Sequence, residues 1–141
     1  MSEKGNKKRI LAVDDTAIVL TRISNILGND YEVITVNSGV RALRYLEQEK
    51  PDLILLDIQM AQKDGIQTLR EIRTMKDRED IPVIMLTGVE DRDFVLESAK
   101  LGICDYILKP FYSDDFLKRI SRVLGQETQK KDEGLTEKGD S

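Results

Sequence analysis

The chain has 141 residues and a formal net charge of −4 at pH 7, with 40% hydrophobic and 34% charged residues. These values are typical of one soluble globular domain, and the negative net charge argues against non-specific nucleic-acid binding. The sequence contains no long apolar run and no evident secretory signal, which predicts a cytoplasmic protein without membrane contact. With no histidine and one cysteine, the chain cannot form a Ser-His-Asp triad, a His-ligated zinc site or an internal disulfide.

Five short apolar segments of strand length alternate with segments of helical periodicity. The predicted strands are residues 9–13, 31–36, 53–56, 81–86 and 105–108. The helical patterns run over residues 18–27, 40–46, 66–75, 94–99 and 116–124. Gly102 and Gly125 each follow a helical pattern, where a left-handed C-cap is expected. This alternation predicts an α/β fold, a doubly wound parallel sheet with helices on both faces.

Polar residues stand at the carboxyl ends of four predicted strands. They are Asp14 and Asp15, Asp57, Thr87, which Gly88 follows, and Lys109, which Pro110 follows. In an open parallel sheet, functional groups gather at this edge. Any one of these acids, considered alone, could have a purely structural role as a helix N-cap. Their joint placement instead predicts three carboxylates, one hydroxyl and one ammonium group in a single site.

Three neighbouring carboxylates repel, and each raises the pKa of the others unless a cation compensates. Mg2+ binds carboxylate oxygens and could also hold a phosphoryl oxygen. Lys109 could bind a second phosphoryl oxygen, and the hydroxyl of Thr87 could donate to a third. One carboxylate facing the open edge could act as a nucleophile. The set therefore suits phosphoryl transfer. We also expect Asp15→Asn to stabilise the metal-free fold by about 1 kcal/mol or more and to weaken Mg2+ binding.

Four motifs follow one another along the chain: Asp14-Asp15, then Asp57-Ile58-Gln59-Met60 with Asp64-Gly65, then Thr87-Gly88, then Tyr106-Ile107-Leu108-Lys109-Pro110-Phe111. In this order they resemble the receiver domain of two-component response regulators. The resemblance implies a five-stranded (βα)5 sheet of flavodoxin-like, CheY-like type with strand order 2-1-3-4-5. It also implies a receiver domain over residues 7–125, and residues 126–141 then read as a polar, disordered tail or linker.

The resemblance assigns the acids by position. Asp57 would accept the phosphoryl group. Mg2+, or Mn2+ in its place, would be bound by Asp15, Asp57 and the backbone carbonyl of Gln59, with Asp14 helping through a water molecule.

The remaining motif residues would sense the phosphoryl group. Thr87, Gly88 and Lys109 would contact it, and the Lys109-Pro110 bond would be cis. Thr87 and Tyr106 would form the switch, which alters the surface made by the fourth helix, the fifth strand and the fifth helix.

Four positions depart from the usual family pattern. Ala61 stands where the family often has proline, and Gly88 where it usually has alanine. Gln59 and Val89, two positions beyond Asp57 and Thr87, should set the rate at which the phosphate is lost. We expect slow self-dephosphorylation because neither side chain can take a proton from an attacking water.

The partners implied are a sensor histidine kinase or a histidine phosphotransfer protein, and a downstream protein target or C-terminal output domain. The resemblance also allows a phosphorylation-dependent dimer, with no direct nucleic-acid binding and no enzymatic role beyond self-catalysed phosphotransfer. Two alternatives remain at this stage. A metal-dependent phosphohydrolase with an aspartyl-phosphate intermediate would need a second acid placed to protonate a leaving group, and a substrate pocket or cap. The sequence has neither an Asp-x-Asp motif after a strand nor an insertion long enough for a cap. A phosphorylation-independent interaction module on the same fold would need an incomplete acid site.

Overall fold

The computed structural model describes residues 7–61, 63–88 and 92–125, and within them five strands alternate with five helices. The order is β1 (Arg9–Val13), α2 (Ala17–Leu27), β2 (Glu32–Val36), α3 (Gly39–Gln48), β3 (Leu53–Asp57), α4 (Gly65–Ile72), β4 (Val83–Thr87), α5 (Arg92–Lys100), β5 (Asp105–Leu108) and α6 (Ser113–Leu124). The predicted tail or linker, residues 126–141, lies outside the described residues.

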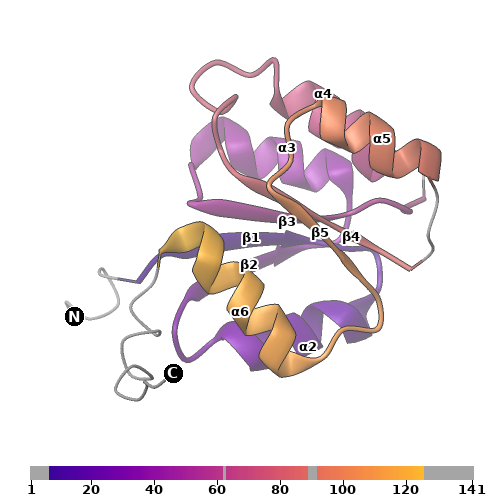
Figure 1. The fold of residues 1–141 in the computed structure, drawn as a ribbon. Coiled ribbons are helices and arrows are strands. Elements are labelled where there is room, and N and C mark those ends of the chain that lie inside the picture. The colour runs from indigo at the N-terminus through magenta and orange to yellow at the C-terminus, as the bar shows by residue number, and fades with distance from the viewer. Residues whose placement is uncertain (1–6, 62, 89–91, 126–141) are drawn as a thin grey trace.

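The strands form one parallel sheet in the order β2-β1-β3-β4-β5. Helices α2 and α6 cover one face of this sheet, and α3, α4 and α5 cover the other (Figure 1). The predicted doubly wound α/β fold and the strand order 2-1-3-4-5 are both confirmed. None of the described helices is long and apolar enough to cross a membrane.

The three central strands are buried on both faces, which explains their nearly continuous apolar sequences. Successive side chains of a strand point to opposite faces and so enter different cores. The core under α2 and α6 takes Ile10 and Ala12 of β1 and Leu53 and Leu55 of β3. The core under α3, α4 and α5 takes Leu11 and Val13 of β1 and Ile54 and Leu56 of β3.

The strand order places the carboxyl ends of β1 and β3 side by side. From β1 the chain crosses to β2 on one side, and it later returns to β3 on the other side of β1. The loops after β1 and β3 therefore lead to opposite faces of the sheet and leave a crevice between them. This is the edge at which the sequence predicts the functional residues.

Local sequence signals predicted some helix ends correctly and others not. Asp64 caps α4 with a complete capping box, and Gly102 and Gly125 adopt the predicted left-handed conformation. The third helical pattern, by contrast, continues to Met75, whereas α4 ends at Ile72. Beyond it the backbone tightens, because the amides of Thr74 and Met75 bond to carbonyls three residues earlier.

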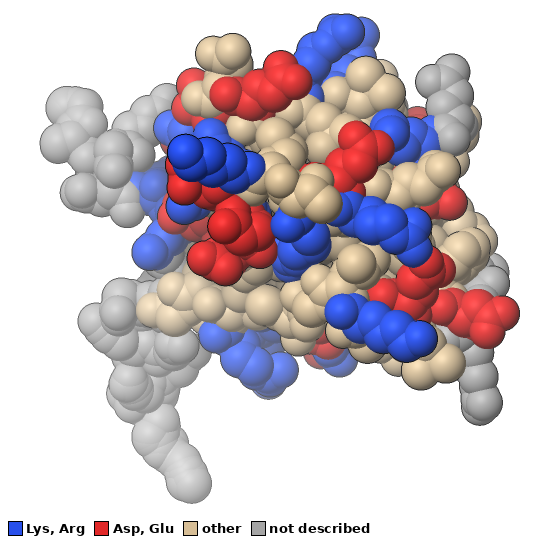
Figure 2. Space-filling view, turned by 90° about the horizontal axis from the view of Figure 1, so that it is seen from above, with Lys and Arg blue, Asp and Glu red and all other residues tan. Residues whose placement is uncertain are grey.

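The face covered by α3, α4 and α5 carries acidic and basic side chains intermixed, without a large area of one sign among the described residues (Figure 2). Opposite charges pair on this face, as in Lys63 with Glu71 and Arg70 with Glu97. The residues described on this face therefore form no basic patch of the kind that a nucleic-acid-binding surface needs.

Candidate functional site

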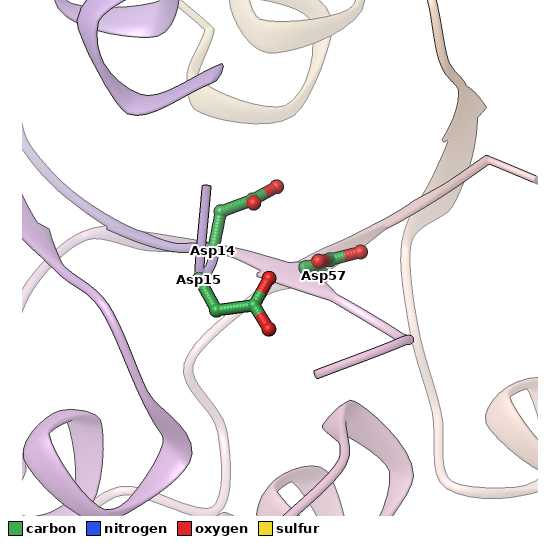
Figure 3. A group of neighbouring side chains, drawn as sticks. All are labelled: Asp14, Asp15 and Asp57. Atoms are coloured by element: carbon green, nitrogen blue, oxygen red, sulfur yellow. The ribbon is translucent and has the colours of Figure 1, made fainter. Parts of the chain in front are cut away.

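Three carboxylates meet where β1 and β3 end. Asp14 and Asp15 directly follow β1, and Asp57 is the last residue of β3. Val13 pairs with Leu56 in the sheet, so the next residue of each strand reaches the same level. One oxygen from each acid lies within 4.8 Å of the others (Figure 3). The predicted acidic cluster is therefore present in the structure.

The three acids differ in burial. Asp14 is fully buried and the exposed fraction of Asp57 is 2%, whereas Asp15 is exposed. The backbone amide of Thr16 donates to Oδ1 of Asp14 at 2.9 Å, and the amide of Ala61 donates to Oδ2 of Asp15 at 3.2 Å. Asp15 therefore lies at the solvent side of the cluster, while the other two carboxylates form its floor.

Lys109 supplies the positive charge that compensates the buried acids. Its Nζ lies 2.8 Å from Oδ2 of Asp14 and 3.2 Å from Oδ1 of Asp57. The backbone amide of Lys109 donates to the carbonyl of Thr87 at 2.7 Å, and the peptide bond to Pro110 is cis. The ammonium group thus reaches the acids from a loop whose start is tied to β4.

The surroundings of Asp57 disfavour its ionised form. Burial raises the pKa of Asp57 from 3.8 to about 6, with Asp14 adding to the rise and Lys109 opposing it. For Lys109, burial acts to lower the pKa, but its contacts with Asp14 and Asp57 outweigh this and raise the value. A further cation near Asp57 would therefore be stabilised by a carboxylate that lacks a full countercharge.

The cluster has the chemistry of a site for a hard divalent cation. Its ligand atoms are all carboxylate oxygens, which Mg2+ prefers, and the exposed Asp15 leaves the cluster open to solvent. Gln59, whose backbone carbonyl the resemblance assigns to the metal, lies two residues beyond Asp57 with an exposed side chain. The residues present therefore fit Mg2+.

A glycine without an assigned role holds the loop after β3 in place. The amide of Gly65 donates to the carbonyl of Ile58 at 2.8 Å, and a Cβ atom at Gly65 would lie 2.1 Å from the backbone oxygen of Asp57. Only glycine permits this close approach of α4 to the end of β3. The sequence signal was present, because Gly65 directly follows the N-cap Asp64 within a motif.

The predicted switch residues lie at different depths. Thr87 ends β4 and is buried, while Gly88 is exposed and has open space around it. Tyr106 lies in the edge strand β5 opposite Met85, with an exposed fraction of 40%. It is therefore not packed beside the acids in this structure. Val89 lies outside the described residues.

Sequence reasoning did not anticipate a contact between α2 and the loop after β5. Nη1 of Arg22 donates to the backbone oxygen of Phe111 at 2.7 Å, and the guanidinium carbon lies 4.7 Å from the centre of the Phe111 ring. The two residues are 89 positions apart, so periodicity could not reveal the pair.

Comparison with known proteins gives consistent results. The family model described as the response regulator receiver domain matches residues 10–121. Among curated proteins, the chain is 41% identical over 122 residues to a probable transcriptional regulator, ycf27, of Guillardia theta, covering 84% of this chain and 46% of that protein. The chain spans about half the length of this relative and of several other curated relatives.

Two solved structures show the same fold over nearly their whole length. The chemotaxis protein CheY4 of Vibrio cholerae aligns with a TM-score of 0.79 at 28% identity, covering 83% of this chain and 98% of that chain. The receiver domain of a sensor histidine kinase from Pseudomonas aeruginosa PAO1 aligns with a TM-score of 0.78 at 30% identity, covering 85% and 99%. That domain was solved with a magnesium ion coordinated in its active-site cleft.

Proposed function

Because the chain belongs to the response regulator receiver domain family of two-component signalling, we propose that Asp57 is its phosphoacceptor and that residues 7–125 form the switching unit. The observation that carries this proposal is the buried carboxylate of Asp57, which shares the ammonium group of Lys109 with Asp14 at the carboxyl edge of the sheet. The phosphohydrolase and the phosphorylation-independent module are not favoured by the family match.

The metal site proposed for this chain consists of Asp14, Asp15, Asp57 and the backbone carbonyl of Gln59. Mg2+, or Mn2+, held there would neutralise the acids and withdraw charge from the incoming phosphoryl group. The chain itself orients the ligands, since the amide of Thr16 fixes Asp14 and the amide of Ala61 fixes Asp15. The receiver domain from Pseudomonas aeruginosa, solved with a magnesium ion in its active-site cleft, supports this assignment by analogy.

Phosphoryl transfer would take place at the carboxylate of Asp57. An oxygen of this carboxylate attacks phosphorus while the bond from phosphorus to the donor breaks, and the donor leaves with the electron pair. Lys109 already lies 3.2 Å from Asp57, so its ammonium group needs little movement to bind a phosphoryl oxygen. Thr87 and Gly88, at the end of neighbouring β4, stand at the edge where the remaining oxygens would emerge.

The proposed switch connects Thr87 with Tyr106. Once phosphate is present, the hydroxyl of Thr87 would turn toward it, and Tyr106 would move from its half-exposed position into the space behind. This change alters the surface formed by α5, β5 and α6. A slow loss of phosphate, set by Gln59 and Val89, stays a prediction from the resemblance.

The proposed partners follow from the family. A sensor histidine kinase or a histidine phosphotransfer protein would supply the phosphoryl group, in the cytoplasm. The curated relatives include transcriptional regulators about twice as long as the matched region, so a C-terminal output domain or a separate protein target would receive the signal. Receivers act as signalling phosphoacceptors, and a phosphorylation-dependent dimer through the switch surface is a further proposal.

The proposed function can be tested with acetyl phosphate and Mg2+, followed by mass spectrometry of the intact protein. We expect one phosphoryl adduct on the wild type, none in EDTA and none on Asp57→Ala. Asp52→Ala, which removes an exposed acid elsewhere on the chain, serves as the matched control and should be labelled like the wild type. An adduct of equal yield on Asp57→Ala, or equal labelling in EDTA, would contradict the assignment.

A further inference from the structure

Arg22 links the two chain segments that flank the proposed phosphoacceptor, although it belongs to none of the four sequence motifs. Its helix, α2, begins next to Asp14, whose Oδ1 accepts the amide of Thr16. Its guanidinium group binds the carbonyl and the ring of Phe111, two residues beyond Lys109. Resting on the function proposed above, we propose that Arg22 is a positioning residue that holds Lys109 in place for phosphoryl transfer.

The backbone from Lys109 to Phe111 is held at three points. The amide of Lys109 donates to the carbonyl of Thr87 at 2.7 Å and attaches the loop to β4. The buried ring of Phe111 stacks on Phe116 of α6, with ring centres 4.4 Å apart. Arg22 provides a third contact, which ties the loop to α2.

The contact of Arg22 with Phe111 bears directly on where the ammonium group of Lys109 lies. A lysine side chain is long and flexible, so the place of its ammonium group depends on the backbone from which it starts. Nζ of Lys109 must remain between Asp14 and Asp57, at 2.8 and 3.2 Å. A charge-assisted hydrogen bond and a cation–π contact are among the stronger non-covalent restraints available for such a loop.

The surroundings of Arg22 allow its removal to be tested in a folded protein. Arg22 is half-buried and lines a groove of about 380 Å3 with Ile18, Val19, Lys109, Pro110 and Phe111. Shortening Arg22 removes no side chain that belongs to either hydrophobic core. We therefore expect substitutions at Arg22 to change the position of the loop more than the stability of the fold.

The experiment compares rates of phosphorylation by acetyl phosphate at saturating Mg2+. Arg22→Met, which keeps an apolar stem, should react about tenfold more slowly than the wild type, as expected for a misplaced charged group. Arg22→Lys keeps a charged donor but loses the planar stacking group, so it should retain an intermediate rate. Arg44→Met, at an exposed arginine of α3, is the matched control and should react like the wild type. Mg2+ affinity should stay unchanged in all three.

A double-mutant cycle separates positioning from a general structural effect. In the Lys109→Ala background, Arg22→Met should cause no further loss of rate, because the group it positions is already absent. In the otherwise wild-type chain, Arg22→Met should also speed acylation of the Lys109 amine relative to exposed Lys118, read by peptide mass spectrometry.

Two results would overturn the inference: a rate for Arg22→Met equal to that of Arg44→Met, or losses that multiply in the cycle. If Arg22→Met unfolds at the assay temperature, Arg22→Lys and Arg22→Gln carry the same comparison. Failure of the wild type to accept phosphate on Asp57 would instead contradict the proposed function itself.

Discussion

Replacing Asp57 by asparagine should stabilise the metal-free protein at neutral pH, although it removes the proposed phosphoacceptor. The carboxylate is buried, and its pKa rises from 3.8 to about 6, mainly because of that burial. At about 1.4 kcal/mol for each pH unit, ionised Asp57 lowers the free energy of unfolding by about 3 kcal/mol at pH 7. Asparagine has nearly the same shape and avoids this cost.

The raised pKa of Asp57 also determines how the free energy of unfolding changes with pH. Between pH 4 and pH 6 the unfolded chain loses the proton of Asp57 while the folded chain still holds it. Stability contributed by the protonated group is therefore present below about pH 4 and is lost as the pH rises through about 6. The advantage of Asp57→Asn should be near zero at pH 4 and reach its full size at pH 7.

The assay is urea unfolding in EDTA at several pH values, with two companion variants. Asp14→Asn should destabilise the protein, because it removes the carboxylate that Lys109 contacts at 2.8 Å. Glu47→Gln, at an exposed acid of α3, controls for the change in net charge and should have little effect. With Mg2+ present the wild type should become more stable than Asp57→Asn, because the cation binds and stabilises the chain that retains the carboxylate of Asp57.

Destabilisation by Asp57→Asn in EDTA at pH 7, or an effect independent of pH, would refute this reasoning. The structure also changes the emphasis of the prediction made from sequence, which placed the stabilising change at Asp15. Asp15 is exposed, so repulsion there is screened by water, and the larger gain is expected at the buried Asp57.

Three further outcomes are expected. Mg2+ affinity should fall as the pH drops below about 6, measured by calorimetry, because protons then compete for Asp57; an affinity independent of pH from 5 to 7 would contradict this. Gly65→Ala should lower the free energy of unfolding by about 2 kcal/mol or more, measured by thermal unfolding, because its Cβ would lie 2.1 Å from a backbone oxygen. Gly88→Ala, with open space around it, should lower that free energy far less. Equal losses in the two variants would show that the loop moves aside. Val89→Glu should speed the loss of phosphate after donor removal by placing a polar group near the attacking water; an unchanged decay would place position 89 away from that path.

Local sequence patterns were sufficient for the elements and for the edge on which the site lies. Strand and helix periods differ, and both are visible within a few neighbouring residues. The apolar runs ending in Asp57 and in Thr87 therefore predicted β3 and β4 and the direction in which these residues project. Motif order then supplied the family, and the family supplied the strand order.

The energetics of the site depended on residues that are distant in sequence. Asp14 and Lys109 are 95 positions apart, and only the folded sheet brings the ammonium group to 2.8 Å from that acid. The same sheet buries Asp57 but leaves Asp15 in solvent, although both lie at the carboxyl ends of apolar strands. The amino-acid sequence alone thus determined which charges gather at the edge of the sheet. Tertiary structure decided which of them are desolvated and which are paired, because burial and Coulomb energy depend on neighbours from every element packed around a group.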